Sequence, residues 1–167
     1  MKSVGTVYFK AMKTTREKLL WHTTRIMRSK GYYGTGIREI LEAANVPKGS
    51  LYHHFPMGKD DLVAEALEEE MVLFANYWKS LSPKGRQQAN PFDGFWKHTV
   101  DETRASPIFL WILVGLETIQ ANNKVARAAK RAYVQFRQIL QQGISEEEVD
   151  SFISKLCGQL IMMRITS

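Results

Sequence analysis

Residues 37–55, with the sequence IREILEAANVPKGSLYHHF, decide the fold that we expect for the N-terminal part of this chain. The stretch opens with apolar residues at helical spacing, namely Ile37, Ile40, Leu41 and Ala44. Asn45 follows, and asparagine tolerates the left-handed conformation in which many helices end. Pro47 disfavours a helical conformation at Val46 and suits the first turn of a new helix. The stretch therefore predicts two short helices joined by a tight turn.

The second of these helices has an unusual surface. Only Leu51 and Phe55 are apolar residues placed to enter a core. The remaining side chains have no obvious core to enter: Lys48, Gly49, Ser50, Tyr52, His53 and His54. Two short helices joined by a three-residue turn are typical of a helix-turn-helix, whose second helix enters the major groove of DNA.

The charge of the chain is unevenly distributed. Residues 1–60 hold eleven Lys and Arg against four Asp and Glu, a net charge of +7. Residues 61–167 hold twelve against thirteen, a net charge of −1. A basic segment followed by a neutral one is the electrostatic pattern of a nucleic-acid-binding unit joined to another module. A basic face that only keeps the protein in solution is the alternative interpretation.

The chemistry of the second helix fits DNA contact. Lys48 can donate to guanine O6 or N7, and Gly49 lets the helix come close to the bases. The alternatives are a solvated charge and a packing glycine. Four side chains can donate to phosphates, which fixes register without reading sequence, namely those of Ser50, Tyr52, His53 and His54. For His54 a purely structural role stays open. Lys59 begins a helix, so its amine and the backbone N–H groups beside it can hold one phosphate together.

The run GYYGTGIREILEAANVPKGSLYHHFPMGKDDLVAEAL, residues 31–67, resembles the DNA-binding domain of TetR-family transcriptional repressors. The resemblance spans roughly Thr15 to Leu67 and is greatest to the LmrA/YxaF-like subgroup, which shares the wording VPKGS…HHFP…GK. Over residues 82–167 it rests on helix order more than on motifs.

The resemblance implies specific roles for residues. Relatives use the positions of Lys48 and Gly49 for base contacts and those of Tyr52 and His54 for phosphate contacts, while that of His53 varies. Family members usually carry Ser or Thr at the position of Gly36. Thr35 can substitute for that residue as a helix cap or as a phosphate contact.

Helical patterns continue on both sides of this stretch. Thr14 and Glu17 form a capping box for a helix that runs to about Lys30, where Gly31 ends it. A longer helix starts near Lys59, and residues 82–91 have the composition of a loop. Further helices are predicted over 92–105, 108–120 and 124–142, and Ser145 with Glu148 caps a last one.

No segment reads as a strand, so the expected fold is all-α: three helices for DNA and about five in a regulatory bundle. We divide the chain into residues 1–12, a basic N-terminal arm or a remnant of cloning, residues 13–58, the helix-turn-helix domain, and residues 59–167, a ligand-binding and dimerisation domain. The helix from Lys59 to Leu81 is expected to link the two domains.

The predicted bundle is rich in aromatic residues, most of which should be core. The same residues would line a pocket for a flat apolar ligand, and the resemblance implies that a small molecule entering this domain releases DNA. Our candidate ligand-binding residues are Phe74, Trp78, Phe95, Trp96, Trp111, Glu117 and Tyr133. Glu117 is a polar exception within an apolar run. It can orient a ligand, or it can pair with Arg104 or a neighbouring helix.

The last two helices are expected to form a dimer interface. A symmetric DNA site needs two reading helices about 34–36 Å apart, and one chain supplies one. The resemblance implies a four-helix bundle between protomers, to which we assign Tyr133, Phe136, Phe152, Leu156 and Leu160. Packing within one chain is the alternative for these positions.

Several other classes of protein are disfavoured. The single Cys157 excludes an internal disulfide framework and fits the cytoplasm. The longest apolar run, residues 108–116, is too short to span a membrane. His53 and His54 point about 100° apart on a helix and cannot share a metal. No catalytic motif or metal-ligand spacing is present, so we expect no catalysis, metal or cofactor.

These observations predict a homodimeric TetR-like transcriptional regulator, most simply a repressor that binds a palindromic operator and is released by a small apolar or aromatic effector. Two alternatives remain, which are a constitutive DNA-binding regulator without an effector and a helical protein-interaction module.

Overall fold

The computed structural model describes residues 14–86, 109–121 and 123–166, and all of its regular elements in these segments are helices. The N-terminal part contains α2 (Thr15–Gly34), α3 (Ile37–Ala44) and α4 (Lys48–His54). The rest contains α5 (Lys59–Ser80), α6 (Pro83–Arg86), α8 (Leu110–Thr118), α9 (Lys124–Gln141) and α10 (Glu146–Thr166). The all-α prediction is confirmed. The helix predicted over 92–105 and the arm 1–12 lie outside the described residues.

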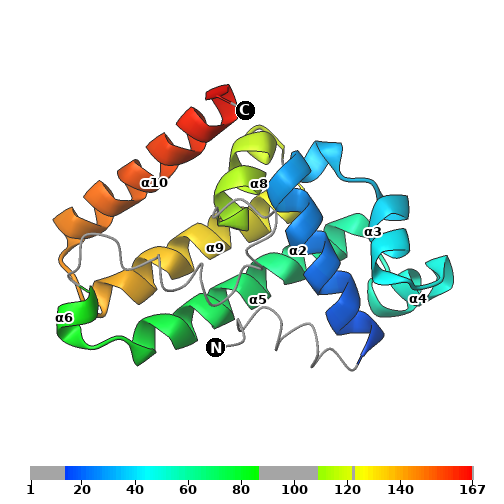
Figure 1. The fold of residues 1–167 in the computed structure, drawn as a ribbon, viewed down its shortest axis with the longest axis horizontal. Coiled ribbons are helices and arrows are strands. Elements are labelled where there is room, and N and C mark those ends of the chain that lie inside the picture. The colour runs from blue at the N-terminus through cyan, green and yellow to red at the C-terminus, as the bar shows by residue number, and fades with distance from the viewer. Residues whose placement is uncertain (1–13, 87–108, 122, 167) are drawn as a thin grey trace.

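The long helix α5 is the centre of the molecule (Figure 1). It lies beside α9, and α2 packs across both α5 and α8. One side of α5 is apolar and faces this core, with Leu62, Val63, Leu67, Phe74 and Trp78 fully buried. One core therefore runs from the N-terminal helices into the bundle.

The predicted helix ends are largely as expected. Thr14 and Glu17 form both hydrogen bonds of a capping box, and Asn45 has left-handed dihedrals of φ 53° and ψ 51°. Gly31 breaks the first helix at φ 75°, but the chain then resumes one more turn to Gly34.

The prediction of a loop over residues 82–91 is wrong at its start, because α6 forms there. The Ser82 hydroxyl accepts the N–H of Gly85 at 3.1 Å, and the Ser82 carbonyl accepts that of Arg86 at 3.1 Å. A serine cap followed by proline at the first helical position is a favourable helix start.

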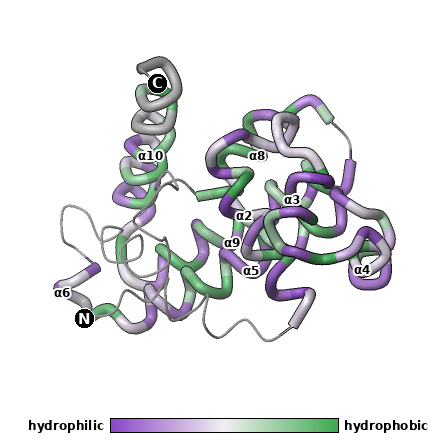
Figure 2. The backbone as a smooth tube through the Cα atoms, turned by 45° about the vertical axis from the view of Figure 1, so that its right-hand side comes forward, coloured by the Kyte–Doolittle hydropathy of each residue, from purple (hydrophilic) through white to green (hydrophobic). Residues whose placement is uncertain are grey.

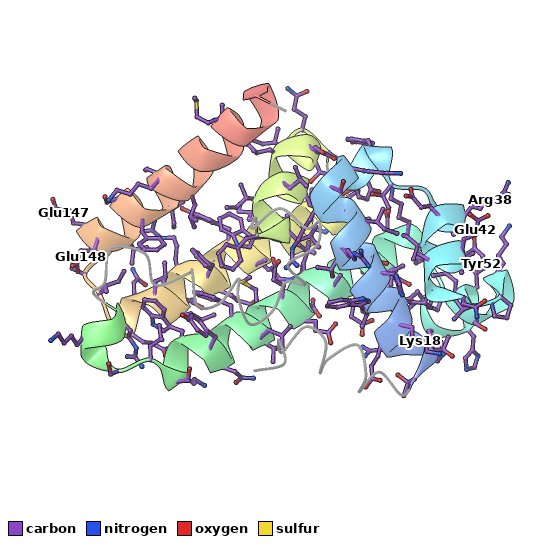
Figure 3. The ribbon with its side chains drawn as sticks, viewed as in Figure 1. Lys18, Arg38, Glu42, Tyr52, Glu147 and Glu148 are labelled. Atoms are coloured by element: carbon purple, nitrogen blue, oxygen red, sulfur yellow. The ribbon has the colours of Figure 1, made fainter. Side chains whose placement is uncertain are left out.

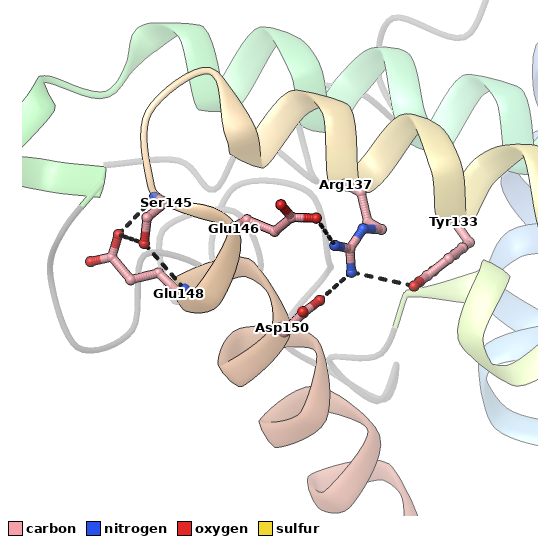
Figure 4. A network of polar contacts seen from close by, with 6 residues as sticks. All are labelled: Tyr133, Arg137, Ser145, Glu146, Glu148 and Asp150. Carbon is pink, nitrogen blue, oxygen red and sulfur yellow. Dashed lines mark hydrogen bonds and ion pairs between the residues drawn. The ribbon is translucent and has the colours of Figure 1, made fainter.

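The corner between α9 and α10 is held by polar contacts (Figure 4). The Ser145 hydroxyl accepts the N–H of Glu148 at 3.3 Å, and the Glu148 carboxylate accepts the N–H of Ser145 at 2.7 Å, which confirms the second capping box. On the inner side Arg137 pairs with Asp150 and with Glu146, the latter at 3.4 Å. From this corner α10 diverges from the rest of the fold (Figures 1 and 2). None of the described helices is both long and apolar enough to cross a membrane.

Candidate nucleic-acid interface

The turn between α3 and α4 has the geometry of a helix-turn-helix. The N–H of Asn45 donates to Glu42 O at 3.2 Å and that of Val46 to Leu41 O at 3.1 Å, which closes α3. Pro47 is extended, with ψ 152°, and its carbonyl accepts the N–H of Ser50 at 3.0 Å to open α4. The sequence IREILEAANVPKGSLYHHF therefore folds as it predicts.

Two apolar residues hold α4 to the core, and the rest of the helix faces outward. Leu51 is 1% exposed and Phe55 is 0% exposed. Lys48, Gly49, Tyr52 and His53 are exposed, while Ser50 and His54 are half-buried. In Figure 2 the α4 segment is mostly hydrophilic. We call the N-terminal helices α2, α3 and α4 the head, and in Figure 3 Tyr52 lies with Arg38 and Glu42 at its outer edge.

Gly49 has no steric role within the protein. A Cβ atom built on it would meet no atom within 4 Å, apart from its neighbours and the backbone of its own helix. Its φ does not lie in the left-handed region that favours glycine. No packing contact therefore explains the glycine at position 49, whereas an open helix surface is compatible with close approach to a DNA groove.

Tyr52 and His54 are partly fixed by neighbours. The Tyr52 ring lies over Gly58, where a Cβ would come within 3.3 Å of Cε1. Gly58 has φ 65° and is the N-cap of α5, so its conformation favours glycine. The His54 ring makes edge contacts with His53 and Phe55, with centroids 5.0 Å and 6.4 Å apart.

Thr35 does not lie where a phosphate contact requires. Its side chain is 2% exposed, and its hydroxyl donates to Gly31 O at 2.6 Å. Gly36 is the N-cap of α3, with no side-chain cap. The expectation that Thr35 caps α3 is therefore wrong, because its hydroxyl closes the end of α2 instead.

Lys59 is turned inward. Its ammonium donates to the backbone carbonyl of Tyr32 and lies 4.3 Å from the centroid of the Tyr32 ring. Burial lowers the pKa of Lys59, while Asp60 and Glu117 act in the opposite direction. The first turn of α5 also carries two carboxylates, Asp60 and Asp61, and Asp61 already accepts the N–H of Met57 at 2.7 Å. This helix start is therefore partly neutralised by its own side chains.

Four of the candidate ligand-binding residues meet in one aromatic cluster, formed by Phe74, Trp78, Phe109, Trp111, Tyr133 and Phe136. Ring centroids within it lie between 4.7 Å, for Phe74 and Phe136, and 6.0 Å, for Phe74 and Trp78. The indole Nε1 atoms of Trp78 and Trp111 are buried, and neither has a hydrogen-bond partner in the described part of the chain. Phe95 and Trp96 lie outside the described residues.

Glu117 is not in the aromatic cluster. Its carboxylate accepts backbone N–H groups of Tyr32 and Tyr33, which corresponds to the neighbouring-helix alternative. Sequence reasoning had no means of finding this contact, since its partners are backbone groups 84 and 85 residues away.

The residues assigned to a dimer interface separate into two groups. Phe136 is 0% exposed within one protomer, so its assignment to an interface is corrected: its ring fills the aromatic cluster. Tyr133, Phe152 and Leu156 are half-buried, and Leu160 lies on α10 with its side chain outside the described residues. Exposed apolar side chains near them include Val134, Ile161 and Met162.

In the described segments no three His, Cys, Asp or Glu side chains lie close enough to hold a metal ion. Cys157 is half-buried on α10, and burial raises the pKa of its thiol. A thiol with a raised pKa is a weak nucleophile at neutral pH.

Comparison with known proteins identifies the head. Residues 19–66 match the model of the bacterial regulatory proteins of the tetR family. Over 55 residues the chain is 51% identical to the HTH-type transcriptional regulator LmrA of Bacillus subtilis, an alignment that covers 33% of this chain and 29% of LmrA. It is 26% identical over 164 residues to the uncharacterized HTH-type transcriptional regulator YxaF of the same organism, covering 92% of this chain and 86% of YxaF. Residues 19–66 therefore match a TetR-family DNA-binding domain.

The whole chain also shares its fold with solved structures. E. coli NemR in its reduced form superimposes with a TM-score of 0.66 at 19% identity, covering 91% of this chain and 88% of NemR. A TetR-family regulator from Agrobacterium tumefaciens gives 0.67 at 17% identity, covering 90% and 87%. At such identities the likeness concerns the fold alone. The matched proteins are transcriptional regulators and not enzymes, and LmrA and YxaF support the predicted subgroup.

Proposed function

We propose that this regulator is a repressor that binds a palindromic operator as a homodimer and is released by a small aromatic effector. The proposal that the protein binds DNA rests on the outer surface of α4. There Lys48 is exposed beside Gly49, and a Cβ atom on Gly49 would meet no atom of the rest of the protein within 4 Å. A surface without protein contacts next to a basic side chain is suited to a groove. DNA is a cytoplasmic partner, so the protein would act there.

In this proposal Lys48 and Gly49 face base edges, while Ser50, Tyr52 and His54 contact phosphates and His53 varies with the operator. Lys59 reaches a phosphate only after its ammonium leaves the Tyr32 carbonyl oxygen. We leave Thr35 out, because its hydroxyl is buried. The DNA-binding domain covers residues 13–58 and the regulatory domain residues 59–167, a boundary that coincides with the start of α5.

The effector would bind at the aromatic cluster. Buried polar groups in proteins almost always have a hydrogen-bond partner, and an unpaired one costs about 1–3 kcal/mol. The N–H groups of Trp78 and Trp111 therefore favour a ligand that carries an acceptor oxygen as well as an aromatic ring. To act as an effector, it must bind the DNA-incompetent state more tightly than the DNA-bound state.

Dimerisation through α9 and α10 is supported by exposed apolar residues on both helices, and by the divergence of α10 from the rest of its own protomer. Val134, Ile161 and Met162 are each more than two-fifths exposed. A second copy would cover them and bring two α4 helices onto one face of DNA.

The test is fluorescence anisotropy of a labelled duplex from the region upstream of this protein's own gene, compared with scrambled DNA over a salt series. We expect a preference of about 10³-fold or more, with strong salt dependence. Negligible binding to both duplexes at low salt would favour a helical protein-interaction module instead. Specific binding that no acceptor-bearing aromatic compound releases would favour a constitutive regulator.

A further inference from the structure

Gly31 breaks α2 one turn before its end, close to the start of the helix-turn-helix. We call this break, together with the turn formed by residues 32–34, the joint. The chain adopts φ 75° and ψ 179° at Gly31, and one further helical turn leads to Gly34. The N–H groups that begin a new turn cannot be satisfied by the preceding helix and need another acceptor. Here those groups belong to Tyr32 and Tyr33, and the helix-turn-helix begins four residues later at Ile37.

The acceptor comes from the regulatory domain. One carboxylate oxygen of Glu117, Oε2, accepts the N–H of Tyr32 at 2.6 Å and that of Tyr33 at 3.1 Å. Glu117 lies near the end of α8, the other residues of which carry no charge. A single acid on this apolar helix therefore caps a turn of the DNA-binding head.

The fit between the two chain segments is close. A Cβ atom on Gly31 would lie 1.9 Å from Glu117 Oε1 and 2.7 Å from Cδ. Its positive φ independently disfavours any other residue. Glycine is thus favoured by the backbone, and any Cβ here would displace the Glu117 carboxylate from its present position.

The same turn is tied to α5. The Tyr32 hydroxyl donates to Asp60 at 2.7 Å, and Lys59 donates to the Tyr32 carbonyl. The joint therefore connects α2, α5 and α8 immediately before the helix-turn-helix starts.

We propose that Glu117 is a positioning residue for DNA recognition, whose carboxylate fixes the direction in which the helix-turn-helix leaves the bundle. In a dimer that direction sets the separation of the two reading helices. The role in DNA recognition rests on the proposed function, whereas the joint itself can be tested without DNA.

The first test is amide exchange of the full-length protein without DNA. In Glu117→Ala the amides of Tyr32 and Tyr33 should exchange roughly tenfold faster, as expected for the loss of one to two hydrogen bonds. In Glu117→Gln the amide oxygen can accept the same N–H groups, so exchange should stay near that of the wild type. Amides in the middle of α5 serve as an internal reference for folding. Unchanged exchange in Glu117→Ala would overturn the joint.

The second test compares two operators, one with native half-site spacing and one with a base pair inserted at its centre. If Glu117 fixes the direction of the helix-turn-helix, Glu117→Ala should lower the ratio of the affinities for the two operators by about fivefold or more. About fivefold is the lower end of the usual coupling between two sites. Glu117→Gln should restore it. If the substitution only destabilised the protein, its affinity for both operators would fall by the same factor, and that result would overturn the positioning role. If the wild type bound no duplex, the DNA role of Glu117 would fall with the proposed function, while the exchange data would still decide the joint.

A double-mutant cycle separates the two reasons for Gly31. Gly31→Ala should destabilise the protein more in the wild type than in Glu117→Ala, because the second background removes the collision and leaves only the backbone strain. Gly36→Ala is the matched control, since a Cβ there meets nothing within 4 Å. Its effect should be equal in both backgrounds. Equal effects of Gly31→Ala would contradict the packing of Glu117 on Gly31.

Discussion

Arg28 of the DNA-binding head and Glu70 of α5 form an ion pair in the core, with Nη2 and Oε1 2.6 Å apart. The two side chains are 7% and 2% exposed, and the N–H of Leu110 donates to both oxygens of Glu70 at 3.0 Å and 2.9 Å. Burial raises the pKa of the Glu70 carboxyl, while Arg28 and the N–H of Leu110 act against this rise. One carboxylate therefore joins α2, α5 and the start of α8.

We predict that Glu70→Ala lowers the free energy of unfolding by about 3–5 kcal/mol, because it takes the carboxylate away from a buried guanidinium. Urea denaturation monitored by circular dichroism measures this loss. Glu42→Ala is the control: Glu42 pairs with Arg38 on the surface of α3 and should contribute at most about 0.5 kcal/mol. Similar losses in the two variants would contradict a special role for the buried pair.

Lys48→Ala should weaken operator binding by about 1–3 kcal/mol and relax the preference for one base pair in each half-site. The reason is that Lys48 is exposed at the first position of α4, where a side chain reaches base edges. Anisotropy titrations with an operator and its single-base variants measure both effects. Lys79→Ala is the control, since Lys79 is an exposed lysine at the far end of α5. A uniform loss over all duplexes would instead assign Lys48 to a phosphate.

Gly49→Ala should affect stability and DNA binding in opposite directions. Alanine replaces glycine in a helix with a gain of up to about 1 kcal/mol, and the new Cβ meets no protein atom within 4 Å. The same Cβ would separate α4 from the groove, so operator affinity should fall. Thermal unfolding and anisotropy on one preparation give both numbers. Unchanged operator affinity would show that the backbone at Gly49 does not approach DNA.

The head of the molecule could be predicted from sequence because its determinants are local. The left-handed Asn45, the extended Pro47 and the two capping boxes each involve residues a few positions apart. Helical spacing is likewise a local pattern, and the apolar residues Leu62, Leu67 and Phe74 that share one side of α5 are buried. Local chemistry also explains the short helix at the start of the predicted loop, since the Ser82 hydroxyl accepts the N–H of Gly85 and caps α6.

The contacts between head and bundle could not be predicted, because they join residues far apart in sequence. Glu117 bonds to backbone groups, which carry no residue-specific pattern, and the partner of Arg28 lies 42 residues away. Phe136 fits the spacing of either an interface or a core, and only the position of Phe74 and Phe109 decides between them. Thr35 is a different case, because its hydroxyl donates to Gly31 O only four residues earlier, and this local bond at the end of α2 takes the place of a cap on α3.

Asp61 gives the stability of the protein a defined response to acid. Its carboxylate accepts hydrogen bonds from Lys124 at the start of α9 and from the N–H of Met57, and the first of these is the main reason that its pKa is lowered. A carboxyl whose pKa is lower in the folded than in the unfolded state contributes stability above its unfolded pKa, about 4, and loses that contribution as the pH falls toward the folded value.

Asp61→Asn removes this contribution. The difference in unfolding free energy between the wild type and Asp61→Asn should therefore be constant from pH 7 to about pH 5 and shrink below about pH 4. Urea denaturation at each pH measures it, with Glu68→Gln as a control for an exposed surface pair. A difference that grew as the pH fell would mean that Asp61 is less acidic in the folded protein than in the unfolded chain, which its two hydrogen-bond donors oppose.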